Sequence, residues 1–200
     1  MRSLLFPLLF FSAITLAQTL ERPKIITEKS GNVTKHWVEG SLASTQVVGC
    51  IPLAEARSTF TPPDLYKGVE KCVAQDNYGL AVGLFALAGA YASFDEDRVI
   101  DKTVEGARAE LIMNTFSAIL QDKKIKFNKA FNRLIEDPER IEKLCKQVQK
   151  IGPPNYYPSY MVLYGSKAFL GNPHEDALVK NFDASVGWRN IQLEYLHCSN

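Results

Sequence analysis

An uncharged stretch at residues 77–94 stands out in the pattern of apolar and polar positions along the chain. It combines glycines and alanines with larger apolar residues, and acidic residues flank it, Asp76 before it and Asp95-Glu96-Asp97 after it. A helix that is apolar on every face must be buried, either in a protein core or in a membrane. Amphipathic segments with capping residues surround this stretch, so the pattern predicts a central core helix and no stable membrane insertion of the mature chain.

Apolar residues recur at helical spacing through most of the chain after residue 61. A first helix is expected at 62–74, because Thr61 can cap it, Pro62 suits its first position and Asp64 completes a capping box. Asp95 is expected to open a third helix, because acidic residues favour helix N-termini. The helices expected beyond the apolar stretch cover residues 95–119, 126–135, 138–151, 159–171, 173–182 and 184–198. Asp137 and Asp183 are expected to cap the helices at 138–151 and 184–198. About seven helices joined by short polar turns predict an all-α single domain over residues 62–200.

An N-terminal arm is expected over residues 18–61, where the pattern is less regular. Residues 24–28 and 33–38 can form a small β-hairpin around a turn at Gly31-Asn32. The apolar cluster at residues 46–51 is the expected point at which this arm docks on the helical body.

Residues 1–17 have the features of a secretory signal peptide. Met1-Arg2 gives a positive start, residues 4–16 are uncharged and mostly apolar, and small residues end the segment at Ala17. The apolar run is too short to span a bilayer comfortably. We therefore expect cleavage after Ala17 and an exported protein of the periplasm or the extracellular space.

Export predicts that the four cysteines form disulfide bonds, because an oxidising compartment favours disulfides. The cysteines are Cys50, Cys72, Cys145 and Cys198, and four cysteines allow three pairings that the sequence does not separate. We favour Cys50–Cys72 with Cys145–Cys198, because each bond would fasten a less regular segment to a helix. A metal site is disfavoured, because the chain contains no Cys-x-x-Cys spacing.

The charge balance gives no sign of a nucleic-acid partner. The chain has 23 basic and 22 acidic residues, and the predicted signal peptide holds one of the basic residues, Arg2. A balanced mature chain has no basic footprint for nucleic acid or for anionic membranes. The local run from Lys123 to Lys126, with Lys129 after it, is expected to be a solvated helix face, with a basic docking patch as the alternative.

Part of the chain resembles a tetratricopeptide repeat. Tyr78, Ala81, Phe85 and Ala88 have the spacing of the second helix of that repeat. In the preceding helix, Leu65, Gly68, Val69 and Cys72 stand where the repeat prefers an aromatic, Leu, Gly and Tyr. No second copy follows at a period of about 34 residues. The resemblance covers some thirty residues, and it implies a similar antiparallel helical hairpin without establishing a repeat protein.

Common catalytic and cofactor motifs are missing from the sequence. It has no Gly-x-Ser-x-Gly elbow, phosphate-binding glycine loop or dinucleotide fingerprint, so no cofactor is expected. The histidines are His36, His174 and His197, and His174-Glu175 lacks the second histidine of a zinc-binding helix. A hydrolase that uses His174 with nearby acids is the alternative function.

A segment rich in tyrosine and proline is the strongest candidate for a binding surface. Residues 153–160 contain three prolines and three tyrosines, in the order Pro153-Pro154-Asn155-Tyr156-Tyr157-Pro158-Ser159-Tyr160, and Tyr164 follows one helical turn later. Tyrosine is enriched at protein interfaces, and a stiff backbone lowers the entropy lost on binding. The sequence therefore predicts a protein partner at Tyr156, Tyr157, Tyr160 and Tyr164. The alternative is a rigid connector whose tyrosines fold back onto the helices.

Overall fold

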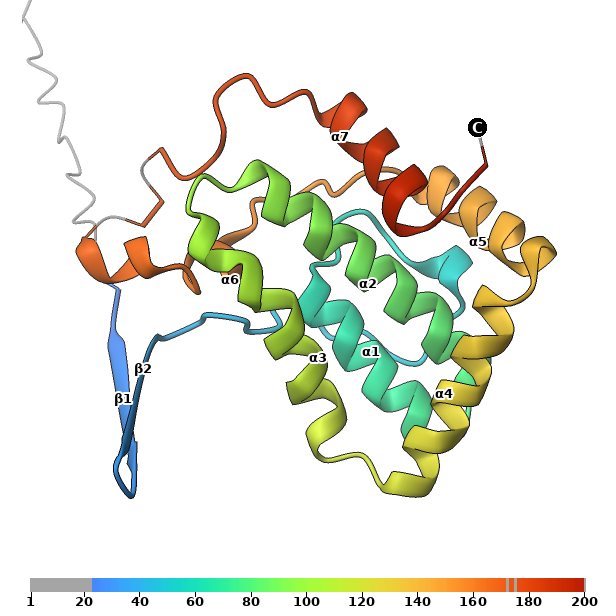
Figure 1. The fold of residues 1–200 in the computed structure, drawn as a ribbon, viewed down its shortest axis with the longest axis horizontal. Coiled ribbons are helices and arrows are strands. Elements are labelled where there is room, and N and C mark those ends of the chain that lie inside the picture. The colour runs from blue at the N-terminus through green and yellow to red at the C-terminus, as the bar shows by residue number, and fades with distance from the viewer. Residues whose placement is uncertain (1–22, 172, 175, 200) are drawn as a thin grey trace, which may run out of the picture.

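A computed structural model describes residues 23–171, 173–174 and 176–199, so the predicted signal peptide lies outside the described residues. In this part the protein has seven α-helices and one two-stranded sheet, in agreement with the predicted helical fold and small hairpin (Figure 1). The elements are β1 Ile25–Ser30, β2 Val33–Val38, α1 Pro62–Ala74, α2 Tyr78–Arg98, α3 Ala107–Ser117, α4 Gln121–Ile135, α5 Pro138–Ile151, α6 Ser159–Val162 and α7 Ala184–Asn190. Three short 3-10 helices lie between them, η1 Leu53–Glu55, η2 Lys102–Gly106 and η3 Ser166–Leu170, and a π-helical turn, η4 Ile191–Tyr195, continues α7.

Helix α2 lies at the centre of the fold. It packs against α1 along its length, and α3, α4 and η4 also contact it (Figure 1). Its residues Leu84, Leu87, Tyr91 and Phe94 are fully buried. By length and composition α2 could cross a membrane, but 67% of its most apolar window is buried inside the protein. The predicted core helix is therefore present.

Small residues on α2 explain how closely its neighbours approach. A Cβ built at Gly89 would overlap the Tyr195 hydroxyl, and one built at Gly68 on α1 would lie 2.9 Å from the Leu84 side chain. At both positions the space that a side chain would need is already occupied. The glycines thus set the separation of α1, α2 and η4.

The predicted boundary at Asp95 is wrong. Helix α2 continues through Asp95 and ends at Arg98, and α3 begins only at Ala107, after η2. Asp95 is fully buried and pairs with Arg98 one turn later on the same helix. Its charge is therefore compensated inside the helix, and it needs no helix N-terminus.

The C-terminal third is also less regular than predicted. In place of one helix over 159–171, α6 has four residues and η3 follows after Gly165. A Cβ at Gly165 would lie 2.6 Å from an Asp101 carboxylate oxygen, so the chain bends closely around that side chain. The short helix expected over 173–182 is not formed in the described part, where Leu178 pairs with Val99 in an isolated bridge. The predicted cap at Asp183 is confirmed, with bonds to two backbone N–H groups of α7.

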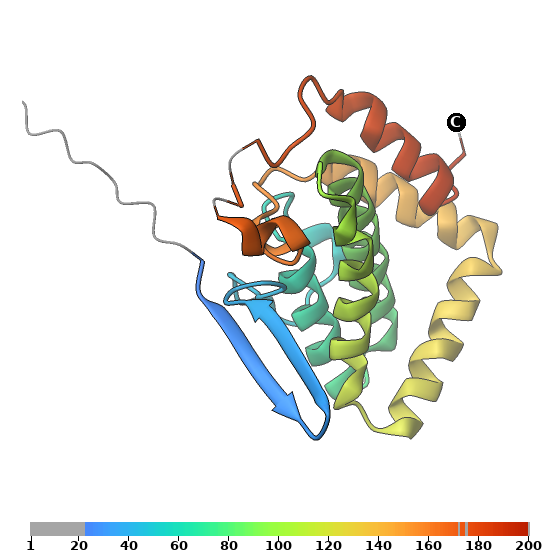
Figure 2. The same cartoon turned by 60° about the vertical axis from the view of Figure 1, so that its left-hand side comes forward.

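The hairpin forms where the sequence predicts it, with a positive φ of 59° at Gly31 in its turn. Its strands pair antiparallel from Ile25 opposite Val38 to Ser30 opposite Val33. Figure 2 shows the hairpin standing beside the helices, while α4 and α5 lie on the other side of α1 and α2. The helical body therefore presents two separate flanks.

Two disulfides are formed, in the favoured pairing. Cys50–Cys72 joins the arm to α1, and Cys145–Cys198 joins the C-terminal segment to α5. Next to the first bond, Val48 is buried in the core, as expected for the docking point of the arm.

Candidate functional site

The four tyrosines predicted as a binding surface occupy different environments. Tyr160 is buried, with 3% of its surface exposed, and Tyr156 is partly buried. Both donate their hydroxyl hydrogens to the same oxygen of Asp95, Oδ2, at 2.9 Å for Tyr156 and 2.8 Å for Tyr160. Tyr157 is 41% exposed, and Tyr164 is half-buried. Two of the four thus fasten residues 153–160 to α2, and the other two remain reachable from solvent.

Arg98 completes the buried polar cluster around Asp95. Its Nε and Nη2 atoms lie 2.8 and 2.6 Å from Asp95 Oδ1, and Nη2 also donates to the Tyr156 carbonyl at 3.0 Å. Burial raises the pKa of Asp95 to about 6, against the opposing effects of Arg98 and the tyrosine hydroxyls. Burial likewise raises the tyrosine pKa values well above 10. Every oxygen of the carboxylate is satisfied, so the cluster is a structural joint between α2 and residues 153–160.

His174, the residue of the alternative hydrolase, is exposed. Its Nδ1 lies 3.3 Å from the Tyr157 hydroxyl, and the two rings are tilted at a centroid distance of 5.4 Å. His36 bonds to Thr27 on the hairpin at 2.9 Å. Among the described residues no three His, Cys, Asp or Glu side chains gather as metal ligands. In the described part, no hydrogen bond joins a carboxylate to His174, so a base with an orienting acid is not assembled there.

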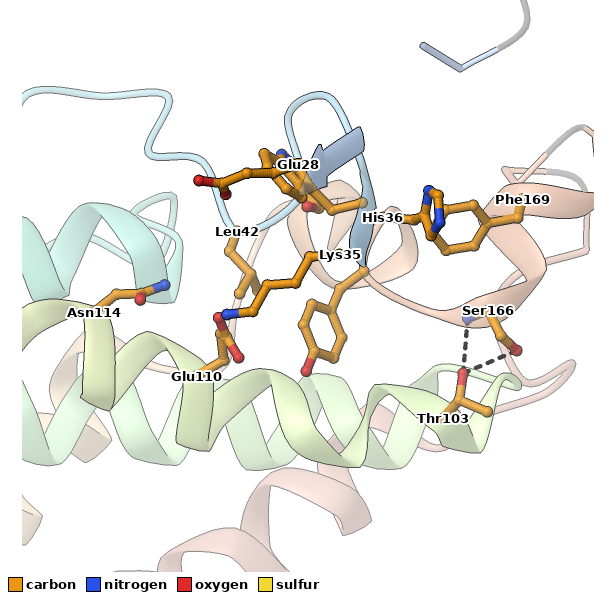
Figure 3. A pocket seen from close by; sticks show the side chains of 12 residues that line it. Glu28, Lys35, His36, Leu42, Thr103, Glu110, Asn114, Ser166 and Phe169 are labelled. Carbon is orange, nitrogen blue, oxygen red and sulfur yellow. Dashed lines mark hydrogen bonds between the residues drawn. The ribbon is translucent and has the colours of Figure 1, made fainter. Parts of the chain in front are cut away.

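A cavity of about 630 Å³ lies between the hairpin and the helical body (Figure 3). Side chains from four regions of the chain line it: Glu28, Lys35, His36 and Trp37 on the hairpin; Ser41 and Leu42 after it; Thr103, Glu110 and Asn114 on η2 and α3; and Tyr164, Ser166 and Phe169 around η3. In Figure 3, Lys35 lies on the hairpin side and Glu110 on the α3 side. The lining combines aromatic rings with hydrogen-bonding groups of both charges, which is the composition of a recognition site.

The hairpin is held to the body mainly at its base. Val38 is buried there, and the Leu42 N–H donates to the Tyr160 carbonyl at 3.1 Å. Lys24 and Glu39 pair at 3.1 Å across the two ends of the hairpin, in an exposed ion pair of little energetic value. Beyond this base the two strands run on beside the helices (Figure 2), and the cavity lies between the hairpin and α3 (Figure 3).

The helical wall of the cavity is well ordered by hydrogen bonds. Thr103 Oγ1 accepts from the Ser166 N–H at 2.8 Å and donates to Asp101 at 2.7 Å, while the Lys167 N–H donates to Asp101 at 2.8 Å. Partial burial favours the neutral form of Asp101, but the hydrogen bonds from Lys167 and Thr103 outweigh this effect and lower the pKa of Asp101. Burial and the charge of Glu110 raise the pKa of Tyr164. Hydrogen bonds thus connect η2 to η3 in this wall, and Tyr164 keeps its hydroxyl proton, so it can act as donor and acceptor.

Sequence reasoning found only Tyr164 among the cavity residues. The other lining residues come from strands, turns and helices that are far apart along the chain. Each is an ordinary surface residue in its own element. No local signal marks them, because the cavity exists only after the hairpin has docked.

No protein family, curated protein or solved structure matches this chain. The chemistry of the cavity residues is therefore the basis for a functional proposal.

Proposed function

We propose that this chain is an exported binding protein that takes a segment of a protein partner into the cavity between the hairpin and α3. The observation that carries the proposal is the cavity itself, which has about 630 Å³ of space and a lining of aromatic, polar and oppositely charged side chains. Standard ligand sites have volumes of about 300–1,000 Å³.

The hairpin supports a protein partner over a small molecule. The sheet has two strands in the described part of the chain, so the outer backbone groups of both β1 and β2 are available for pairing. A lone hairpin is marginally stable in water, and an exposed edge accepts an extended segment as a further strand. Such a segment would gain backbone hydrogen bonds from the edge and side-chain contacts from the cavity.

Export is part of the proposal. The two disulfides are compatible with an oxidising compartment, and the predicted signal peptide gives the route. Two disulfides also suit a recognition domain that must stay folded outside the cell. The likeness of the α1–α2 hairpin to a tetratricopeptide repeat stays a prediction, and the proposed site does not depend on it.

The alternative, a hydrolase that uses His174, has weaker support. His174 is exposed, and its described hydrogen-bond contact is the Tyr157 hydroxyl at 3.3 Å. A catalytic histidine needs an orienting acid and a nucleophile within hydrogen-bond reach. Hydrolysis of activated esters by the mature protein that disappears in His174→Ala would favour the enzyme.

Affinity capture from the natural host tests the proposed site. The bait is the mature, disulfide-bonded protein, compared with Tyr164→Ala and Phe169→Ala in the cavity and with Val186→Ala on α7 as control. Val186 is 51% exposed and outside the cavity, so its change leaves the site intact. We expect one partner to be lost with both cavity variants and kept with the control. Equal recovery of every bound protein by all four baits contradicts the proposal.

A further inference from the structure

A second hollow lies on the opposite flank, between the N-terminal half of α2 and the helices α4 and α5. Its wider section encloses about 610 Å³ and its narrower section about 270 Å³. The two sections share Gly79, Leu80, Ala130 and Arg140, so they form one continuous groove. We call it the α2–α4 groove.

Positive charge is concentrated in this groove. Its cationic lining residues are Lys126, Lys129, Arg133, Arg140 and Lys143, and its acidic lining residue is Asp76. The whole chain, by contrast, is nearly neutral, with 23 basic and 22 acidic residues. The groove therefore carries a local field that the overall composition does not show.

Few of these cations are neutralised by neighbours. Asp76 already accepts from Lys123 at 3.1 Å and from the Tyr78 hydroxyl, which lowers the pKa of Asp76. Lys126 has a long contact of 3.7 Å with Asp122, and Arg140 pairs with Asp137 at 2.8 Å. Within the described chain no ion pair involves the three remaining cations, which are Lys129, Arg133 and Lys143. They face the groove without a countercharge.

The narrow section has an apolar floor. Its apolar lining residues are Pro52, Leu53, Leu80, Val82, Ala130, Leu134 and Leu144. Two glycines of α2, Gly79 and Gly83, also line this section and leave room in it. A Cβ built at Gly79 would meet nothing within 4 Å, and at Gly83 it would touch only Leu53, at 3.5 Å. Lys126, Lys129 and Arg133 thus line only the wide section, while the adjoining narrow section offers apolar side chains beside Arg140 and Lys143.

We propose that the α2–α4 groove binds a free single-chain amphiphile with an anionic headgroup, of the fatty-acid class. The headgroup lies among Lys126, Lys129 and Arg133, and the alkyl chain lies on Leu80 and Leu134 in the narrow section. Charge complementarity selects the anionic end, and buried apolar contact holds the chain. The site is separate from the hairpin cavity and does not depend on the function proposed for it.

The lining of the narrow section favours an alkyl chain over an extended peptide. Most of the side chains that line this section are apolar, so they offer few hydrogen-bond partners. An alkyl chain has no hydrogen-bonding groups to leave unpaired there, whereas the backbone N–H and C=O groups of an extended peptide would lose their water partners.

Calorimetric titration with a homologous series tests the proposal. The probes are hexanoate, octanoate, decanoate and dodecanoate, added to the mature, disulfide-bonded protein below the micelle concentration of each probe. Each buried methylene contributes about 0.8 kcal/mol, so affinity should rise about fourfold per methylene and level off when the narrow section is full. Dodecyltrimethylammonium, which has the same chain and the opposite charge, should bind at least tenfold more weakly than dodecanoate.

Two variants locate the site. In Lys129→Glu/Arg133→Glu, repulsion of the headgroup should weaken dodecanoate about tenfold or more, while Arg189→Glu on α7 should leave its affinity unchanged. Ala130→Trp fills the junction of the two sections and should abolish the dependence on chain length. Circular dichroism before titration confirms that each variant is folded.

Three results would overturn the proposal. One is affinity that does not change with chain length, and another is equal binding of the anionic and cationic probes. The third is a dodecanoate affinity that Lys129→Glu/Arg133→Glu leaves intact. If a tetraglutamate peptide binds more tightly than dodecanoate and the acids show no chain-length effect, the groove recognises an acidic peptide segment and the amphiphile is excluded.

Discussion

Replacing Arg98 with methionine would leave a fully buried carboxylate, that of Asp95, without its countercharge. Asp95 is fully buried, and both contacts of its Oδ1 atom are with Arg98, at 2.8 and 2.6 Å. Its Oδ2 atom keeps the hydroxyls of Tyr156 and Tyr160. Methionine has a similar length and no charge, so the change removes the ion pair while retaining most of the apolar packing.

The size of the effect depends on pH, because Asp95 can take up a proton. Its pKa is raised from 3.8 to about 6 in the folded protein. A raised carboxyl pKa gives a stability contribution that is complete below pH 3.8 and is lost as pH rises through about 6. Without Arg98 the folded pKa rises further. A pH of 7.5 is about 1.5 units above the pKa of Asp95, so protonating the carboxyl at this pH costs about 2 kcal/mol. Because the variant can protonate Asp95 to avoid an unpaired buried charge, the electrostatic part of the destabilisation is at most about 2 kcal/mol.

A second part of the cost does not depend on pH. Arg98 also donates to the Tyr156 carbonyl at 3.0 Å and lies over the Tyr156 ring at 5.4 Å from its centroid. Losing these contacts costs about 1–2 kcal/mol. Arg98→Met should therefore destabilise the fold by about 3–4 kcal/mol at pH 7.5 and by about 1–2 kcal/mol at pH 5.

Urea unfolding followed by far-ultraviolet circular dichroism measures both values on the oxidised protein. Arg189→Met, which changes an exposed arginine on α7, is the matched control and should stay within about 0.5 kcal/mol of the unmodified protein at both pH values. Carboxyl-carbon NMR provides an independent readout, with Asp95 titrating near pH 6 in the unmodified protein and higher in Arg98→Met. An equal loss of stability at both pH values would refute the reasoning, because it would show that Asp95 does not titrate in this range.

Two further predictions concern packing and crosslinks. Gly89→Ala should lower the free energy of unfolding by about 1–3 kcal/mol, because its Cβ would overlap the Tyr195 hydroxyl. Gly79→Ala is the control and should be neutral or slightly stabilising, because its Cβ meets nothing within 4 Å. Thermal unfolding compares the two variants. Replacing Cys145 and Cys198 by alanine opens a loop of 53 residues and should cost about 4 kcal/mol, against about 3 kcal/mol for the loop of 22 residues closed by Cys50 and Cys72. Urea unfolding of the two double variants would contradict the loop-entropy reasoning if the shorter loop proved the costlier one to open.

The sequence predicted those parts of the fold that have a local physical cause. The capping box at Thr61 and Asp64 starts α1 as expected, and the capping aspartates Asp137 and Asp183 begin α5 and α7. Gly31 gives the hairpin its turn. In each case the residues that determine the structure lie within a few positions of one another, so their spacing is visible in the sequence.

The errors arose where distant residues decide the outcome. An acidic residue such as Asp95 predicts a helix N-terminus from its local sequence. Its actual partners, Tyr156 and Tyr160, lie 61 and 65 positions away, so no local pattern reveals them. The same contacts explain why these two tyrosines are joints of the fold. The residues of the two candidate sites also come from segments that are far apart in the sequence. Lys126 and Lys129 were visible as a basic run, but the groove also needs Arg140 on α5 and the glycines of α2.

Site-specific photocrosslinking in the natural host tests the central claim, that the hairpin cavity binds a protein partner. A photoreactive phenylalanine analogue replaces Tyr164 in the cavity in one version and exposed Val186 on α7 in another, and the exported proteins are irradiated under non-reducing conditions. We expect a discrete crosslinked species from position 164 that is absent from position 186 and disappears when Phe169→Ala is added. No crosslinked species from position 164, or the same species from both positions, would contradict it.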